Sequence, residues 1–468
     1  RTKSPRFPVG ILEQCFLLAL AYLEKIGYKG PLALGCDDTK LQAALTPYHD
    51  SETNTWKILG STGEPIVVEN LDQLAQVVAS GELVKAEKIR LWVLSIPLPK
   101  VPPFMLCALA IGSNLSTNDL FALHQKVIDG LLRHNIQVVS YGADGTDTER
   151  QVQDLFRASA SSVKTVKFIN PLNSEDISIS IPFFRPKPHT SDISTSNREF
   201  PIALAQDSKH YRSGARVLTL VNDVTHHGRV RVIVEHPDSP MFKRDVIKAD
   251  KQDDLAAVRL FSAATLRHQI KHHPEHLGSI IYHFVFGELC DAWQSRKVHH
   301  AERIRMSWRG WFFLQEWRNF LRKAGYREDR HLISRQAVDI TNKLVTNLLI
   351  LILIHRDHLQ SNAQPFLPWM HGTEANEHFF GVIRSQIPDF NYADFIYSAV
   401  KTSLLISGTY REGTTTAANA RASGYHHTCH VDEGVPISRF IQFPTDAEIQ
   451  DEIDRAAEEA TSLIQALG

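Results

Sequence analysis

The chain has few of the features that would place it outside the cell or in a membrane. Its cysteines, with no Cys-x-x-Cys pair among them, are Cys15, Cys36, Cys107, Cys290 and Cys429. Such spacing fits no disulfide framework and favours a reducing compartment. No signal peptide opens the chain, and the longest apolar run, residues 344–354, is too short to cross a bilayer. We therefore expect a soluble intracellular protein with no membrane partner.

Net charge is also almost absent, because 51 Lys and Arg residues oppose 52 Asp and Glu residues. Binding to nucleic acid depends on neutralising phosphates with Lys and Arg, so any such contact must come from a local basic patch. Hydrophobic residues make up 43% of the 468 residues. That fraction is sufficient for buried cores in the two or three domains that this length predicts.

An amphipathic helix is predicted after Thr373, a candidate N-cap. Phe379 and Ile383 share an apolar stripe. The residues of the polar stripe are Glu374, Glu377, Gly381 and Arg384. A glycine inside a helix costs about 1 kcal/mol relative to alanine, so it often marks close approach by another group. A solvated acidic face explains the pattern by itself, but two acidic motifs upstream favour a site.

Both upstream motifs follow apolar strands. Residues 32–36 lead into Asp37 and Asp38, and the β-branched run 136–141 leads to Asp144. Taken singly, Asp-Gly after a strand is usually only a turn. In chain order the motifs are strand–Asp, further strands, helix, strand–Asp and, much later, the helix with Glu377. That order is typical of an RNase H-like nucleotidyl-transfer domain.

Phosphodiester cleavage and strand transfer explain why three acids would be needed. An attacking and a leaving oxygen must both be held and compensated in charge, which two divalent ions about 3.5–4 Å apart can do. Mg²⁺ retains several waters and takes few carboxylate ligands, so three acidic side chains suffice. We predict that Asp37, Asp144 and Glu377, the acidic triad, are the catalytic residues and the ligands of two Mg²⁺ (or Mn²⁺) ions.

The same motifs resemble those of the P-element and THAP-domain DNA transposases. Residues 372–384, Gly-Thr-Glu-Ala-Asn-Glu-His-Phe-Phe-Gly-Val-Ile-Arg, look like the signature in which an acidic residue precedes Phe-Phe or Phe-Ser, Gly and Arg. Residues 36–41, Cys-Asp-Asp-Thr-Lys-Leu, resemble the first aspartate motif, and Asp144-Gly145 resembles the second. Residues 207–210 are similar to an Asp-x-x-His element of the family. The wording Pro-Trp-x-His-Gly-Thr-Glu at 368–374 is typical of a fungal transposase-like branch.

Several positions depart from the family pattern. Asp38 stands where the family usually has Glu, and the asparagine often found after the second aspartate is absent. The Lys and Arg-Asn expected after His210 are also absent. Because the chain moreover begins with Arg1, we expect that segments of the biological chain, such as an N-terminal DNA-binding module, are missing. None of these departures removes a predicted metal ligand.

The resemblance implies a cut-and-paste DNA transposase that performs metal-dependent DNA cleavage and strand transfer by a DDE mechanism. Its partners would be transposon ends and target DNA, bound by a homodimer or higher oligomer in the nucleus. Although one family member uses a nucleotide, no GxxxxGK[ST] loop occurs here, so GTP binding is not inferable. Two alternatives stay open: a domesticated DNA- or chromatin-binding protein without cleavage activity, and a helical scaffold whose acidic motifs are coincidental.

Further polar residues are candidates for supporting the metal site or contacting phosphate. They are Asp38, Asp207, His210, Glu374, His378 and Arg384. For Asp207 and His210, capping of a strand end is an equal alternative. The candidate DNA-binding residues, which are interleaved with aromatics, are Arg303, Arg305, Arg309, Arg318, Arg322 and Lys323. A helix pair with inward aromatics and solvated arginines explains this basic segment equally well.

Two histidine-rich sets suggest zinc, but neither has the paired Cys-x-x-Cys that makes a zinc motif specific. The first set is His268, His272, His273 and His276. The second set is His426, His427, Cys429 and His430. With 23 histidines in the chain, clusters of this kind arise by chance. The predicted site therefore includes neither set.

The predicted fold class is α/β: an RNase H-like domain with a mixed sheet, interrupted by a large α-helical insertion, with helical N- and C-terminal extensions. The predicted parts are a helical segment (1–29), the first part of the catalytic domain (30–210), the insertion (211–365), the second part with the Glu377 helix (366–410) and a tail with a helix (411–468). Strands are predicted near residues 32, 56, 66, 91, 105, 138 and 202, with helices at 71–80, 118–134 and 148–158. Longer helices are predicted at 256–272, 279–294, 300–324, 334–356 and 446–467.

Overall fold

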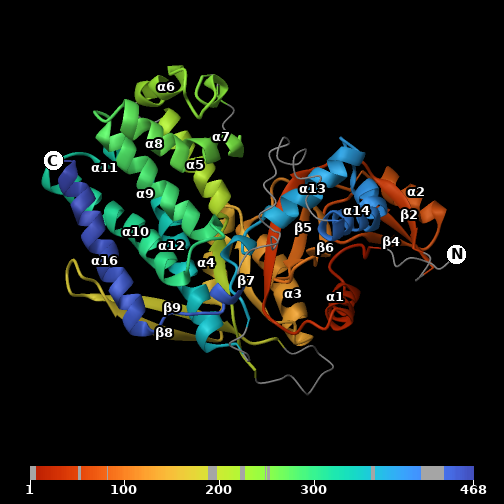
Figure 1. Ribbon diagram of the computed structural model, residues 1–468. Helices are drawn as coiled ribbons and strands as arrows, with labels where there is room; N and C mark the ends of the chain where they lie inside the picture. The colour runs from red at the N-terminus through yellow and green to blue at the C-terminus, as the bar shows by residue number, and fades with distance from the viewer. Residues whose placement is uncertain are drawn as a thin grey trace. The chain divides into compact units, whose positions relative to one another are not determined.

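The computed structural model describes residues 7–50, 54–81, 83–187, 198–221, 227–247, 249, 253–359, 364–412 and 437–467. It forms two compact units, shown in Figure 1. Unit 1 comprises Arg1–Ser162, Pro182–Ile202 and Met370–Glu433. Unit 2 comprises Val163–Ile181, Ala203–Trp369 and Gly434–Gly468. Both units are therefore built from segments far apart in the sequence.

A mixed sheet lies at the centre of unit 1. β1 (Leu32–Lys40) pairs antiparallel with β5 (Lys88–Ser95) on one side and parallel with β7 (Val138–Ala143) on the other. β6 (Phe104–Ile111) pairs antiparallel with β5, so the strand order is β7-β1-β5-β6. β5 is buried along almost its whole length, as its apolar sequence predicts for a central strand. The mixed sheet confirms the predicted α/β class.

Helices cover both faces of this sheet. α3 (Thr117–Arg133) and α4 (Asp147–Ala158) pack together on one face, and α1 (Glu13–Lys25) contacts α3 and β6. On the other face, α13 (Glu374–Gln386) contacts β1 and β5, and α14 (Tyr392–Glu412) contacts β6 (Figure 1). The core on that side includes Leu91 and Val93 of β5 together with Phe379 and Phe380 of α13. Trp92 of β5 points the opposite way and donates its indole N–H to His124 of α3.

A small antiparallel sheet of β2 (Thr46–Asp50), β3 (Thr55–Leu59) and β4 (Ile66–Val68) follows β1, with α2 (Leu71–Ala79) after it. β3, β4 and α2 lie where the sequence predicted a strand, a strand and a helix. β2 was not predicted, because its sequence Thr-Pro-Tyr-His-Asp is polar and contains proline. Its backbone nevertheless pairs along the whole of β3.

Unit 2 is mainly helical. Its first helices are α5 (Ser208–Val221), α6 (His227–Glu235), α7 (Asp254–Leu260), α8 (Ala263–His272) and α9 (Leu277–Gln294). The later ones are α10 (His300–Lys323), α11 (Glu328–His331), α12 (Arg335–Asp357) and α16 (Asp446–Ala466), with short 3-10 turns at Lys243–Asp245, Pro368–Met370 and Ile437–Arg439. α10 packs against α9, α12 and α16 (Figure 1). The apolar stripe of α16 is buried at Ile449, Ile453, Ala456 and Ala460, as predicted.

α12 is long and apolar enough to span a membrane by length and composition, but 72% of its apolar window is buried inside the structure. Burial of this kind is what a core helix of a folded domain shows. β11 (Ala203–Gln206) packs against α12, and Leu204 N donates to Asn347 Oδ1 at 3.1 Å. The apolar run at 344–354 is therefore part of a core, as expected from its length.

Several elements differ from the sequence-based expectation. The predicted helix 256–272 is interrupted between α7 and α8, because Ser262 Oγ accepts the Thr265 N–H at 3.2 Å and begins a new helix. β8 (Ser162–Ile169) and β9 (Asp176–Phe184), which pair with each other, and α5 and α6 were not predicted. β10 (Phe200–Pro201) pairs with the end of β9. Residues 188–197, between β9 and β10, lie outside the described residues.

Candidate active site

Asp37 and Asp144 lie at matching positions on neighbouring strands. β1 and β7 run parallel, with Ala33 opposite Ser140 and Gly35 opposite Gly142. Each aspartate follows its glycine by two residues, and residues two apart in an extended chain point to the same face. Because parallel strands lie about 4.8 Å apart, this register brings the two carboxylates to the same edge of the sheet.

A pocket of about 380 Å³ lies at this edge. We call it the aspartate pocket; its polar lining includes Asp37, Asp38, Lys40, Lys88, Arg90, Asp144, Thr146 and Glu149. Two acids of the predicted triad, Asp37 and Asp144, line this pocket, and backbone and side-chain donors orient them. Asp37 Oδ1 accepts the Asp38 N–H at 2.7 Å, and Asp144 Oδ1 accepts the hydroxyl of Thr146 at 2.7 Å and its N–H at 3.2 Å. Thr146 also caps α4, so the turn that holds Asp144 is fixed by the helix that follows it.

α13 approaches the sheet closely because two glycines face it. A Cβ on Gly35 would lie 2.6 Å from Asn376 Oδ1 and 2.9 Å from the Gly372 carbonyl oxygen. A Cβ on Gly142 would lie 3.0 Å from the carbonyl oxygen of His371. The side chain of Asn376 donates to the Leu91 carbonyl at 2.7 Å. The face of the sheet that bears Gly35 and Gly142 is thus the face that α13 covers.

Glu377 lies on α13 between two points at which this helix contacts β1. One contact is Asn376, against Gly35. The other is Arg384, whose Nη2 donates to Thr39 Oγ1 at 2.6 Å. Asp37 lies between Gly35 and Thr39 on β1 and shares their face, while Glu377 shares a helix stripe with Arg384, seven residues on. These two contacts therefore align the helix of Glu377 with the strand of Asp37.

The three carboxylates do not form a closed ligand set in this structure. In the described residues, the groups of three closely spaced ligand atoms are His236–His268–His272 and His273–Glu275–His276, without the acidic triad. Glu377 is also not among the residues that line the aspartate pocket. Carboxylates repel one another when no cation lies between them, so a separated set is consistent with a metal site. The donors are all oxygens of acids, which fits hard cations such as Mg²⁺ and Mn²⁺.

Asp38 follows Asp37 on β1 and lines the same pocket, where its carboxylate pairs with Arg90. Arg90, 4% exposed, donates to Asp38 through Nε at 2.6 Å and Nη2 at 2.9 Å, and through Nη2 to Glu149 at 2.6 Å. Two carboxylates from β1 and α4 thus hold one guanidinium of β5. The bonds with Arg90 place Asp38 in an ion cluster that also lines the aspartate pocket, and its support of a metal site stays a prediction.

His124 and Tyr141 extend the cluster. Trp92 donates to His124 Nδ1 at 3.0 Å, and His124 Nε2 lies 2.8 Å from both the Tyr141 hydroxyl and Arg90 Nη1. Tyr141 in turn donates to Glu149 at 3.0 Å. Burial, followed by the charge of Arg90, lowers the pKa of His124 well below its usual value, which keeps the ring neutral. Burial also raises the pKa of Glu149, while Arg90 opposes that rise.

The sequence analysis did not identify this ion cluster. Its available signal is an arginine in the middle of the otherwise apolar run Ile89–Leu94, because a charge inside a buried strand needs a partner. Asn376, Gly35 and Gly142 were also missed as positioning residues. The sequence signal for the two glycines is their position, two residues before Asp37 and Asp144.

The other predicted support residues lie in different surroundings. Glu374 and His378 are buried in α13, and Arg384 is exposed and contacts β1. Asp207 lies in unit 2, where its Oδ1 accepts the Lys209 N–H at 2.7 Å at the start of α5. His210 Nδ1 lies 3.9 Å from Asp207 Oδ2. Capping of α5 is therefore the role that these contacts support for Asp207.

The predicted basic segment needs revision. Arg303 is fully buried and donates to the carbonyls of Ala292 and Ser295, both at 2.5 Å. Arg309 is also buried and pairs with Glu288 and, through Nε at 2.6 Å, with Glu459. These two arginines therefore serve the packing of unit 2 and do not reach DNA.

The remaining basic residues of this segment differ in exposure. Arg305 lies 3.6 Å from Glu452, Arg318 lies 3.2 Å from Glu328, and Arg322 donates to Glu328 at 2.6 Å. Arg322 and Lys323 are exposed. DNA binding by these residues stays a prediction, and the second histidine-rich set, His426 to His430, lies outside the described residues.

The contact of α13 with Gly35 makes a direct prediction. Gly35→Ala adds a methyl group that the Gly372 backbone and Asn376 must avoid, so we expect a loss of about 1–3 kcal/mol in the free energy of unfolding. Urea denaturation followed by circular dichroism measures this loss. Gly408→Ala, in α14 with no atom within 4 Å of the added Cβ, is the matched control and should not destabilise the protein. Equal stability of Gly35→Ala and wild type would contradict the described docking.

Comparison with known proteins finds a solved structure of similar fold. The chain is similar to a solved structure described as the Drosophila P element transposase strand transfer complex, with a TM-score of 0.52 and 14% sequence identity. The similarity covers 86% of this chain and 82% of that chain. No family model and no curated protein matches the sequence. At this level of identity the similarity shows the fold, so the chain has the fold of a P element transposase.

Proposed function

We propose that this protein is a cut-and-paste DNA transposase of the DDE type, related to the fungal transposase-like branch. The observation that carries the proposal is the register of β1 and β7, which gives Asp37 and Asp144 equivalent positions beneath α13. The similarity in fold to a transposase structure that covers most of both chains supports it. A coincidental set of acids in a helical scaffold would require no such register.

In this proposal Asp37, Asp144 and Glu377 bind two Mg²⁺ or Mn²⁺ ions, which supply charge for an attacking and a leaving oxygen when bound. The strand ends and the capped turn at Thr146 hold the first two carboxylates rigidly. Arg384 binds Thr39 and keeps the helix of Glu377 aligned with β1. The ion cluster around Arg90 joins β1, β5 and α4 at the wall of the aspartate pocket.

The substrates would be transposon ends and then target DNA. Because two ends must be held together for joining, we propose a dimer or higher oligomer on DNA, in the nucleus. Lys40 and Lys88 are opposite one another on β1 and β5 and line the aspartate pocket next to the two aspartates. We assign them to the phosphates that flank the cleaved bond, since Lys binds phosphate as a point charge.

A charge-removal variant tests this assignment. Lys40→Gln/Lys88→Gln should weaken DNA binding and reduce the steepness of log affinity against log salt by about 1–2. Each phosphate contact that is removed no longer releases counterions when DNA binds. Fluorescence anisotropy on a labelled duplex, at several salt concentrations, gives the slope. Lys25→Gln, an exposed lysine on α1, is the control and should leave the slope unchanged. An unaltered slope in the double variant would refute the assignment.

The cleavage activity itself requires DNA that the protein would recognise. Transposon ends flank the transposase gene, so the DNA to use is a plasmid that carries the genomic sequences on both sides of this coding sequence. We expect nicking and joining that need Mg²⁺ or Mn²⁺ and stop when EDTA is added. Binding to this plasmid without any metal-dependent cleavage would instead support the domesticated DNA- or chromatin-binding alternative.

A further inference from the structure

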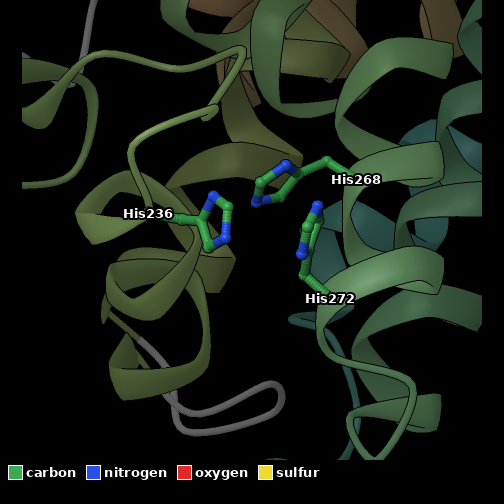
Figure 2. A group of neighbouring side chains, drawn as sticks. All are labelled: His236, His268 and His272. Atoms are coloured by element: carbon green, nitrogen blue, oxygen red, sulfur yellow. The ribbon is translucent and has the colours of Figure 1, made fainter.

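A cluster of histidines in unit 2 is separate from the acidic triad. His268 and His272 lie one turn apart on α8, and His236 follows the last residue of α6. Figure 2 shows the three imidazole rings turned toward a common space. One nitrogen from each ring lies within 4.8 Å of the corresponding nitrogens of the others. Histidines four apart on one helix face are a common pair of zinc ligands.

The surroundings of His268 favour a ligand. Its side chain is 7% exposed, and its Nε2 is buried without a hydrogen-bond partner in the described part of the chain. A buried polar atom without a partner carries an uncompensated cost of desolvation. Simple ring packing would leave this cost in place, whereas a metal bond at Nε2 removes it.

The other two histidines complete the arrangement. The backbone N–H of Asp238 donates to His236 Nδ1 at 3.2 Å, a contact that the ring would give up on binding a metal, since a neutral imidazole offers only one lone pair. The ring centroid of His236 is 4.8 Å from that of His268 and 4.2 Å from that of His272.

We propose that His236, His268 and His272 bind a transition-metal ion, Zn²⁺ by preference, that joins α6 to α8. Imidazole nitrogens suit Zn²⁺ and not the hard cations expected at the acidic triad. Three protein ligands leave a fourth tetrahedral position for water. Zinc–nitrogen bonds are about 2.0–2.1 Å long, so the rings, whose nitrogens lie within 4.8 Å of one another, would turn further toward one another on binding.

The proposed metal ion would restrain the α6 segment. His236 ends the segment that carries α6, and about thirty residues of chain separate it from His268. A bond between the two closes this loop and holds the α6 segment against α8, in the way that structural metals contribute to folding. The site is independent of the proposed transposase activity, since none of its residues belongs to unit 1.

Direct metal binding tests the proposal. Full-length protein is treated with chelator and dialysed, and Zn²⁺ is then titrated by calorimetry, with Co²⁺ used in parallel as a spectroscopic probe. We expect one tight site per chain, visible Co²⁺ bands of the tetrahedral type, and a rise in melting temperature when Zn²⁺ is added. His272→Ala and His236→Ala, which change half-buried residues, should each weaken Zn²⁺ binding by about 100-fold or more.

Two controls make the result specific. His331→Ala removes an exposed histidine on α11 and should leave the affinity for Zn²⁺ unchanged. His276→Ala alters the neighbouring group of His273, Glu275 and His276 and should also leave the tight site in place. The proposal is overturned if wild type shows no saturable binding, if His272→Ala binds as tightly as wild type, or if His276→Ala alone abolishes binding. Circular dichroism of each variant shows whether its fold is intact.

Discussion

Asp144→Asn is expected to abolish metal-dependent DNA cleavage and strand transfer while leaving the fold and DNA binding intact. The amide has nearly the same shape but lacks the negative charge that a hard divalent cation requires. Thr146 can still donate to the side-chain oxygen of residue 144, so the turn before α4 should persist. We expect a loss of rate of at least about 10³-fold, or about 4 kcal/mol in the activation barrier. Glu377→Gln should behave in the same way.

Asp147→Asn is the matched control. Asp147 lies three residues further along, in the first turn of α4, with a largely exposed side chain that pairs with Arg150. Its side chain is the same carboxylate as that of Asp144 but does not line the aspartate pocket. Nicking and joining of the plasmid are measured for each variant with Mg²⁺ and with Mn²⁺. Strand transfer at the wild-type rate in Asp144→Asn or Glu377→Gln would remove that residue from the catalytic assignment.

Arg90→Met is expected to destabilise unit 1 by about 3–5 kcal/mol, the usual cost of removing one partner from a buried ion cluster. The substitution leaves Asp38 and Glu149 close together with no cation between them. Urea denaturation gives the free energy of unfolding.

Two comparisons isolate the effect of charge. Lys126→Met breaks the exposed ion pair with Glu64 and should cost at most about 1 kcal/mol, because solvent screens that pair. Adding Asp38→Asn and Glu149→Gln to Arg90→Met should recover much of the lost stability, since no unpaired charge then remains. A triple variant no more stable than Arg90→Met would show that packing, and not charge, explains the effect.

The sequence was most informative where local pattern and chemistry coincide. The alternation of β1, β5, β6, α3 and β7 follows from apolar runs and caps such as Ser116, whose capping box begins α3. The helix of Glu377 and the strand positions of Asp37 and Asp144 were predicted in the same way. The packing of α13 against β1 could be expected only from family resemblance, because nothing in residues 37, 144 and 377 themselves specifies that their elements pack together.

The sequence was less informative where tertiary contacts decide a residue's role. Arg303 reads as part of a basic surface, yet it is buried and satisfied by backbone carbonyls that no sequence pattern reveals. His236 is far from the histidines of α8 in the chain and was missed for that reason. β8 and β9 were missed because many of their side chains are polar and exposed, so they lack a clear apolar alternation.

The most direct measurement for the central claim is anomalous diffraction from crystals soaked in Mn²⁺, which locates a bound metal without reference to activity. Our account predicts an anomalous peak at the aspartate pocket, in contact with Asp37 and Asp144 and approached by Glu377 of α13. The peak should be absent from crystals of Asp144→Asn. Bound Mn²⁺ at other acidic positions only, with none between Asp37 and Asp144, would contradict the account.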